Sequence, residues 1–295
     1  MRMRFCGSVT VALITVLGGC AQRADVTTVG SGTGVGTVDV ASVRAAPDAA
    51  VEAGSARFEM TIAIQSAEGS YDLVATGGYS GRQMSLRMDI GEALAGAAGA
   101  TGETFPAGVT EPMEIVVDGD ATYLRIPALA GGVGSGTWLS IDSSDLGLAS
   151  SLGVGAGATD PAQLLATLRG ISDDITDVGT EEVRGVTTTH LAGTIDIARA
   201  LDGVTGDRAL LRGQLDALGA TSAGIPVDVW IDADGLVRRF AIDVSNVMPA
   251  SGAAAGDAAT MTLELFDYGE PFSVVVPDPS VTTSYRDVLG GVGQS

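Results

Sequence analysis

The sequence of 295 residues contains no lysine, one histidine and two cysteines, and aromatic residues make up only 4% of it. All 16 basic residues are therefore arginine, and against 36 acidic residues they leave a formal net charge of −20. A surface this acidic repels phosphate backbones and anionic lipid headgroups. The composition therefore argues against nucleic-acid binding and against electrostatic adhesion to a membrane.

The N-terminus carries two arginines, Arg2 and Arg4, followed by an apolar run from Val9 to Leu17 and then Gly18-Gly19-Cys20. This run is too short to span a bilayer. The pattern is similar to the signal peptide and lipobox of bacterial lipoproteins, which implies cleavage after Gly19 and acylation of Cys20. An ordinary secretory signal cut near Ala21 is the alternative.

Cleavage and acylation would leave no free thiol, because Cys6 lies in the signal and Cys20 carries the lipid. Disulfides, zinc–cysteine sites and cysteine nucleophiles are then excluded. Beyond the signal no apolar run reaches about 18 residues, so no further transmembrane helix is expected.

The chain divides into four expected parts. They are a signal peptide at 1–19, the lipidated cysteine with a glycine-rich tether at 20–40, a single large domain at 41–280 and a C-terminal tail at 281–295. The alternating glycines at 29–37 favour a flexible spacer, since they lack the spacing of a phosphate-binding loop and no strand precedes them.

Within the domain the dominant pattern is alternation of apolar and polar residues, which predicts β-strands. In 57–64, for example, Phe58, Met60, Ile62 and Ile64 share one face. Short turns such as Asp118-Gly119-Asp120 and Asp234-Gly235 predict hairpins. The expected strands are 57–64, 70–79, 83–89, 113–117, 121–126, 137–141, about 171–178, 186–196, 226–232, 236–245 and 260–268.

Helix signals are fewer. Asp160-Pro161 begins a helix that ends at Gly170, and a second helical region covers 196–218, most clearly from Asp207 to Gly219. Consecutive hairpins favour an antiparallel sheet, and about eleven strands must curl. The sequence therefore predicts an α+β fold in which one strongly curved antiparallel sheet, a half-barrel, carries helices on its concave side.

Two phrases carry a family resemblance: 179–186 (GTEEVRGV) with Thr189-His190, and 227–239 (VDVWIDADGLVRR). With the lipobox, the 57–64 strand and Asp160-Pro161, they resemble the actinobacterial lipoproteins of the LppX/LprA/LprF/LprG group. The resemblance implies a LolA-like half-barrel that holds acylated lipids or glycolipids in an apolar cavity. The long Ala/Gly-rich loops at 91–111 and 142–159 depart from that pattern.

The apolar phase of the strands is rich in methionine, including Met261, and flexible methionines suit acyl chains of varied shape. The alternative is that they fill the contact between sheet and helices. The apolar loop 146–154 is either a lid at a cavity mouth or a plain connection. The expected cavity lining is Phe58, Met60, Ile62, Leu73, Met84, Leu86, Met88, Met113, Ile115 and Leu263.

Catalytic and metal motifs are weak. His190 lies in an apparent strand without a Gly-x-Ser-x-Gly elbow, which favours a structural role over a general base. The segment 232–235 fits a hairpin better than a calcium loop, because two required ligand positions are missing. The pairs Asp173-Asp174 and Glu181-Glu182 are interpreted as solvated charge and not as a glycosidase dyad. We therefore expect no enzyme activity, no metal site and no cofactor.

The leading hypothesis is a lipid-anchored protein on the extracytoplasmic face of the cell membrane. It would bind a lipid or lipoglycan and carry or transfer it in the cell envelope, together with a transport partner that the sequence does not identify. The alternative is a non-catalytic interaction or sensor lipoprotein with a filled core and no lipid ligand.

Overall fold

The structure is a computed structural model that describes residues 39–66, 69–89, 91, 111–126, 137–142, 161–196, 199–200, 224–245 and 258–287. The signal peptide, Cys20, the tether up to residue 38, Asp160, the 207–219 helix and the 146–154 loop lie outside the described residues. They remain predictions of the sequence. The last residue assigned to the tether, Val40, is instead the first residue of a helix.

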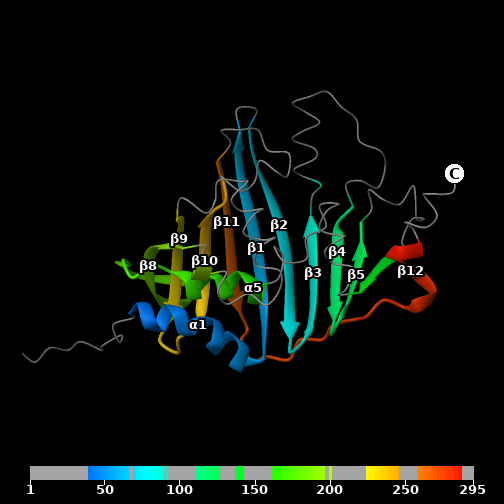
Figure 1. Ribbon diagram of the computed structural model, residues 1–295, viewed down its shortest axis with the longest axis horizontal. Coiled ribbons are helices and arrows are strands. Elements are labelled where there is room, and N and C mark those ends of the chain that lie inside the picture. Colours follow the sequence, from blue (N-terminus) through cyan, green and yellow to red (C-terminus); the bar gives the residue numbers. More distant parts are fainter. Residues whose placement is uncertain are drawn as a thin grey trace, which may run out of the picture. The chain divides into compact units, whose positions relative to one another are not determined.

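A single sheet of twelve strands organises the described chain (Figure 1). Its order is β12-β6-β5-β4-β3-β2-β1-β11-β10-β9-β8-β7. Every neighbouring pair is antiparallel except β12 with β6, which is parallel. The strands are β1 (Ser55–Ser66), β2 (Gly69–Ser80), β3 (Gln83–Asp89), β4 (Met113–Asp118), β5 (Ala121–Arg125), β6 (Trp138–Asp142), β7 (Thr176–Val183), β8 (Val186–Ile195), β9 (Ile225–Asp232), β10 (Val237–Asp243), β11 (Ala258–Phe266) and β12 (Thr282–Ser284).

The architecture confirms the predicted α+β half-barrel: one curved sheet whose edge strands, β7 and β12, do not pair with each other. Hairpins join consecutive strands on each side of a central seam where β1 pairs with β11. At the β7–β8 turn, Arg184 and Gly185 both have positive φ (50° and 79°), as a tight hairpin turn requires. Residues 282–284, which the sequence analysis assigns to a tail, form β12 beside β6.

One strand boundary is wrong in the sequence analysis. The predicted strand at about 171–178 is instead β7 at Thr176–Val183, and only an isolated bridge joins Ile171 to Ile195. The register shifts between Asp177 and Gly179, so the bulge hides the alternation that defines the strand.

Within the described ranges, the sheet is accompanied by the helices α1 (Val40–Ala53) and α5 (Pro161–Ala166) and by the 3₁₀ turns η4 (Thr167–Gly170) and η6 (Pro279–Val281), the last of which precedes β12. The Asp39 side chain accepts a hydrogen bond from the Ser42 amide and caps α1, and Gly54 ends it in the left-handed conformation. The sequence analysis did not predict α1, whose interior contains Pro47. Among the described helices, none is long and apolar enough to cross a membrane.

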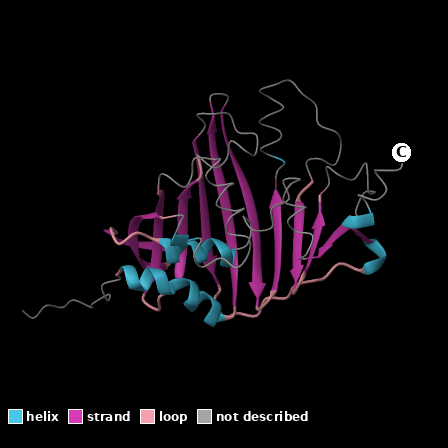
Figure 2. Ribbon diagram, in the orientation of Figure 1, coloured by secondary structure: helices cyan, strands magenta, loops and turns pink. Residues whose placement is uncertain are grey.

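The core lies on the concave face, where the apolar phase of the strands meets the helices. Figure 2 shows the helices on this side of the sheet. Val43, Ala46 and Ala50 of α1 and Leu165 and Leu168 of α5 and η4 are at most 3% exposed. α1 packs on β1, β9 and β10, and η4 packs on β8. The helices therefore cover the half of the concave face that is built from β1 and β8–β10.

The packing of β2 against its neighbours also requires glycine at position 77, because there is no room for a side chain there. A Cβ there would collide with the Ser85 carbonyl oxygen and come within 2.7 Å of the Phe58 ring. We predict that Gly77→Ala lowers the free energy of unfolding by about 1–3 kcal/mol, as overpacking does in well-packed interiors. Urea denaturation measures the effect. Thr76→Ala, at the exposed neighbouring position, is the control, and equal stability of the two variants would contradict the packing argument.

Candidate functional site

The ten residues predicted to line a cavity all lie on the concave face of the sheet. The register between neighbouring strands places these residues together, because two residues that are directly opposed on neighbouring strands point to the same face of the sheet. Four pairs are directly opposed: Met60 with Leu263, Ile62 with Leu73, Leu86 with Ile115, and Met88 with Met113. Phe58 and Met84 complete the set on the same face of β1 and β3.

Burial divides these ten residues into two groups. Phe58, Met60 and Leu263 are at most 1% exposed, and Phe58 packs against Gly77. Met84, Leu86 and Ile115 are also buried. In contrast Ile62, Leu73, Met88 and Met113 are only half-buried at the rim of the apolar core. The first group belongs to the core, while the residues of the second group are only partly covered by the rest of the protein.

The two halves of the concave face differ in their cover. In Figure 1, α1 and α5 lie in front of β8–β11 and β1, whereas none of the described helices lies in front of β3, β4 or β5. The directly opposed Met88 and Met113 belong to this second half. We call the concave surface of β2–β6 the apolar bed.

The sequence analysis missed other members of the apolar bed. Leu124, Leu139 and Ile141 are at most 5% exposed on β5 and β6, and Tyr79 and Val117 pack beside them. Alternation in the predicted strands 121–126 and 137–141 already indicated which face Leu124, Leu139 and Ile141 share. The residues that lie next to them on neighbouring strands could not be identified, because a single sequence does not show which strands pair or in which register.

The convex face carries a network of charged and polar side chains that sequence reasoning did not assemble. His190 lies between two carboxylates: Nδ1 is 2.9 Å from Glu181 and Nε2 is 2.8 Å from Asp228. The imidazole stacks on Trp230 with 4.1 Å between ring centroids. The indole N–H of Trp230 donates to Glu181 at 2.8 Å.

This geometry gives His190 a structural role. Both ring nitrogens are engaged by carboxylates, so neither is left for a hydroxyl nucleophile. The hydrogen bond from Trp230 and then that of His190 hold the pKa of Glu181 below its usual range. Glu181 is exposed, as its interpretation as solvated charge implies, and in addition its carboxylate is hydrogen-bonded to Trp230 and His190.

The network continues to the centre of the sheet through Glu264 on β11. Arg239 on β10 donates to Glu264 at 2.7 and 2.9 Å, and Arg184 donates to it at 2.6 Å. Partial burial of Glu264 opposes its ionisation, but the hydrogen bonds from Arg239 and Arg184 outweigh it and lower its pKa. Arg184 also pairs with Glu59 on β1 at 3.2 Å.

Arg184 reveals a bend in the β7–β8 hairpin. The hairpin turn lies three strands from β11 in sheet order, which would be about 14 Å in a flat sheet and beyond the reach of an arginine side chain. The turn must therefore fold over the convex face.

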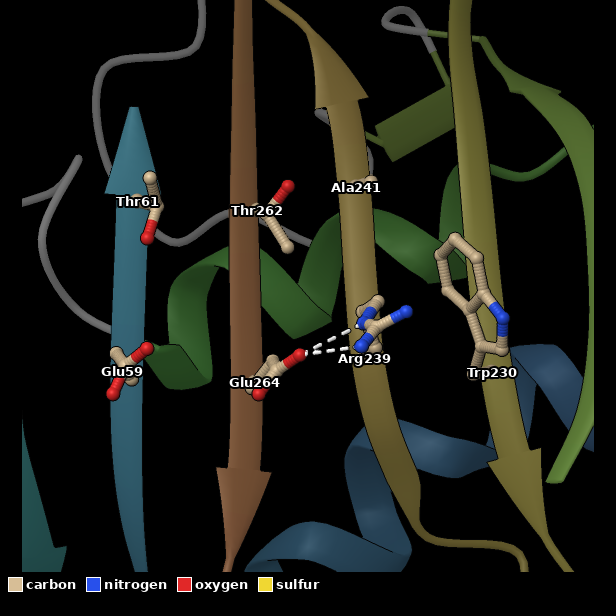
Figure 3. A pocket seen from close by; sticks show the side chains of 7 residues that line it. All are labelled: Glu59, Thr61, Trp230, Arg239, Ala241, Thr262 and Glu264. Carbon is tan, nitrogen blue, oxygen red and sulfur yellow. Dashed lines mark hydrogen bonds and ion pairs between the residues drawn. The ribbon is translucent and has the colours of Figure 1, made fainter. Parts of the chain in front are cut away.

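Beside the Arg184 turn lies an open hollow of about 390 Å³ (Figure 3). It is lined by Glu59, Thr61, Trp230, Arg239, Ala241, Thr262 and Glu264.

The remaining acidic candidates have local structural roles. Asp232 caps the β9–β10 turn by accepting from the amides of Asp234 and Leu236, and it pairs with Arg238 at 2.6 Å, which confirms the hairpin interpretation of 232–235. Asp173 binds Arg44 of α1 at 2.7 Å, and this hydrogen bond lowers its pKa. Among the described residues no group of three or more His, Cys, Asp or Glu side chains converges as a metal site would require.

The depressed pKa of Glu264 predicts acid-dependent stability. A carboxyl whose pKa is lower in the folded state stabilises the fold above its ordinary value of 4.5, and this contribution is lost as the pH falls below that value. We expect Glu264→Gln to cost about 1 kcal/mol at neutral pH, with the difference from the wild type shrinking below pH 4.5. Urea denaturation across this pH range tests it, with the exposed Glu182→Gln as control. A difference that is constant with pH would contradict the assignment.

No protein-family model matches the chain. An uncharacterized 31.2 kDa protein from Streptomyces griseus, in the rplA-rplJ intergenic region, is 27% identical over 177 residues, which cover 55% of this chain. The chain spans about half (52%) of the length of that relative.

Two solved structures resemble the chain in outline. The lipoprotein LppX of Mycobacterium tuberculosis matches 80% of this chain and 97% of its own, with 16% identity and a TM-score of 0.42. LprF of Mycobacterium bovis matches 81% of this chain and 96% of its own, with 15% identity and a TM-score of 0.39. At this level of identity the likeness concerns the fold alone.

Proposed function

We propose that this protein is a lipid-anchored lipoprotein on the extracytoplasmic face of the cell membrane. It binds an acylated lipid or lipoglycan on the concave face of its sheet and carries or transfers that lipid within the envelope. The lipid anchor is attached to Cys20, and the tether at 20–40 separates it from the domain.

The observation that carries this proposal is the apolar bed. It continues the core across β2–β6, and its half-buried members Leu73, Met88 and Met113 are not fully enclosed by the rest of the protein. The described helices pack on the other half of the concave face. An apolar surface of this kind is stabilised when a hydrocarbon chain covers it.

The free energy available to such a site is substantial. Each methylene removed from water contributes about 0.8 kcal/mol, so one long acyl chain supplies roughly 10 kcal/mol before ordering costs. Methionine side chains adapt their shape, and the opposed Met88 and Met113 give the bed a surface that accepts chains of varied length and branching.

The contacts of His190 on the convex face agree with a non-catalytic role for the protein. The single histidine is held between Glu181 and Asp228, so both of its ring nitrogens are engaged by carboxylates. The competing proposal, an interaction or sensor module with a filled core, differs in one measurable property, which is the capacity of the concave face for a ligand.

Binding of an acyl probe tests the proposal directly. We expect delipidated protein to bind a fluorescent long-chain fatty acid at about one equivalent. The double substitution Met88→Trp and Met113→Trp fills the bed, and it should weaken binding by tenfold or more, about 1.4 kcal/mol. Fluorescence titration measures the affinity.

The control for this titration is Thr61→Trp, which adds the same ring on the convex face. Binding by this variant should equal that of the wild type. If the wild-type protein does not bind the probe, or if the bed and convex variants bind it equally well, the carrier proposal fails and the interaction module takes its place.

The lipid anchor is tested separately. Cys20→Ser should move the protein from the membrane fraction to the medium and remove the acylated N-terminal peptide from its mass spectrum. Cys6→Ser, within the signal, should change neither property. Retention of the Cys20→Ser protein in the membrane would contradict anchoring through this residue.

A further inference from the structure

The β7–β8 hairpin forms one edge of the sheet, and its outer strand buries little apolar surface. Within the described sheet, β7 pairs with β8 alone. Of the eight residues of β7 only Val183 is buried, and Val178 is 53% exposed. A strand with few buried apolar contacts opens at a low cost in free energy. The side chains that tie β7 to neighbouring strands therefore contribute much of its attachment.

The imidazole of His190 on β8 makes one of these ties. Its Nδ1 lies 2.9 Å from a carboxylate oxygen of Glu181 on β7, and its Nε2 lies 2.8 Å from a carboxylate oxygen of Asp228 on β9. The ring thus joins three neighbouring strands. The His190 side chain is only 12% exposed, whereas the side chains of Glu181 and Asp228 are 45% and 44% exposed.

The number of protons on the ring decides whether both contacts are hydrogen bonds. An ionised carboxylate only accepts hydrogen bonds, and a neutral imidazole has one N–H donor and one lone pair. In the neutral form, one ring nitrogen of His190 would direct its lone pair at a carboxylate that lies within hydrogen-bonding distance. The imidazolium has an N–H on each nitrogen and satisfies both carboxylates. The two contacts therefore fit the charged form of the ring.

Glu181 is an acceptor in this arrangement. Its second carboxylate oxygen accepts the indole N–H of Trp230 at 2.8 Å. The hydrogen bond from Trp230 and then that from His190 hold the pKa of Glu181 below its usual range, so the carboxylate is ionised at neutral pH. The proton between Glu181 and the imidazole therefore belongs to the ring.

The other groups around the ring also favour the imidazolium. The ring of His190 stacks on Trp230, with 4.1 Å between the centroids and 15° between the planes, and an indole face stabilises a cation. Arg239 on β10 opposes it, but Trp230 lies between the two residues in the register of β8, β9 and β10. Figure 3 shows Arg239 bound to Glu264, at 2.7 Å. Two carboxylates in direct contact outweigh one paired and more distant cation.

From these contacts we infer that His190 is held as an imidazolium and that its charge makes the β7–β8 hairpin a pH-sensitive edge of the sheet. The ring clamps β7 to β9 while it is charged and both carboxylates are ionised. When the ring loses its proton, a lone pair faces one carboxylate and β7 is tied less firmly. The clamp lies on the face opposite the apolar bed and does not depend on lipid binding.

The clamp weakens at both ends of the pH range. A folded state that holds the imidazolium through two carboxylates loses stability as the pH rises and the ring gives up its proton. Glu181 acts in the opposite direction, because a carboxyl whose pKa is lowered by folding loses its contribution as the pH falls below its ordinary value of 4.5. The clamp is therefore complete only between these two limits.

Nitrogen NMR of the imidazole tests the charge of the ring directly, because His190 is the only histidine in the sequence. In the full-length protein we expect both ring nitrogens to carry a proton at neutral pH. A neutral ring with a single N–H under these conditions would overturn the inference.

Amide hydrogen exchange tests the effect on the hairpin. Protection factors correct for the intrinsic effect of pH on exchange. From about pH 6 to about pH 9, we expect those of the β7 amides to fall about tenfold or more, while those of β1 and β11 at the centre of the sheet stay unchanged. Constant protection of β7 over this range would contradict the clamp.

Two substitutions separate the clamp from ordinary packing. In Asp228→Asn the amide donates to the lone pair of a neutral ring, so β7 should stay protected at both pH values. His190→Phe keeps a ring on Trp230 but removes both nitrogens, and β7 should be weakly protected at both pH values. The matched control is Glu182→Gln, an exposed carboxyl on the same strand, which should keep the pH dependence of the wild type. Wild-type pH dependence in either clamp variant, or its loss in the control, would exclude His190 as its source.

Discussion

The constraint on which the whole structure depends is that alternate residues of every strand point to opposite faces. Twelve strands in register collect the apolar phase, for example Met60, Leu263 and Phe240, on one surface. Exposing the whole of this apolar surface to water would be unfavourable in free energy. Curvature and helices cover part of it, and the part that they leave half-buried is the surface on which we propose that a hydrophobic ligand is held.

Much of this could be predicted from the sequence. Strands β1 to β6 and β8 to β11 follow from alternation and turn residues, and β3 coincides with its predicted limits. β7 was displaced because its bulge breaks the alternation, and α1 was missed because Pro47 interrupts an alanine-rich segment without a strong apolar stripe. The face shared by the ten predicted lining residues was accessible because it follows from strand periodicity alone.

The convex face was not predictable in the same way. The partners of Glu264 come from a neighbouring strand and from a hairpin turn three strands away, so their meeting depends on register and on bending of the β7–β8 hairpin. In the sequence, polar residues that alternate with apolar ones look the same whether they are only solvated or are bonded to a neighbouring strand. Only the assembled sheet distinguishes Glu181, which binds His190 and Trp230, from its exposed neighbour Glu182.

The seam between β1 and β11 has a consequence for how the protein reaches its native state. Strands β1–β6 and β7–β11 each form from neighbouring hairpins, whereas the seam joins Arg57 to Phe266 from opposite ends of the described chain. Such a distant pairing carries a large loop-closure cost and is made slowly. During folding, each half exposes an open strand edge until the seam closes, which makes this step the point at which a chaperone has most to protect.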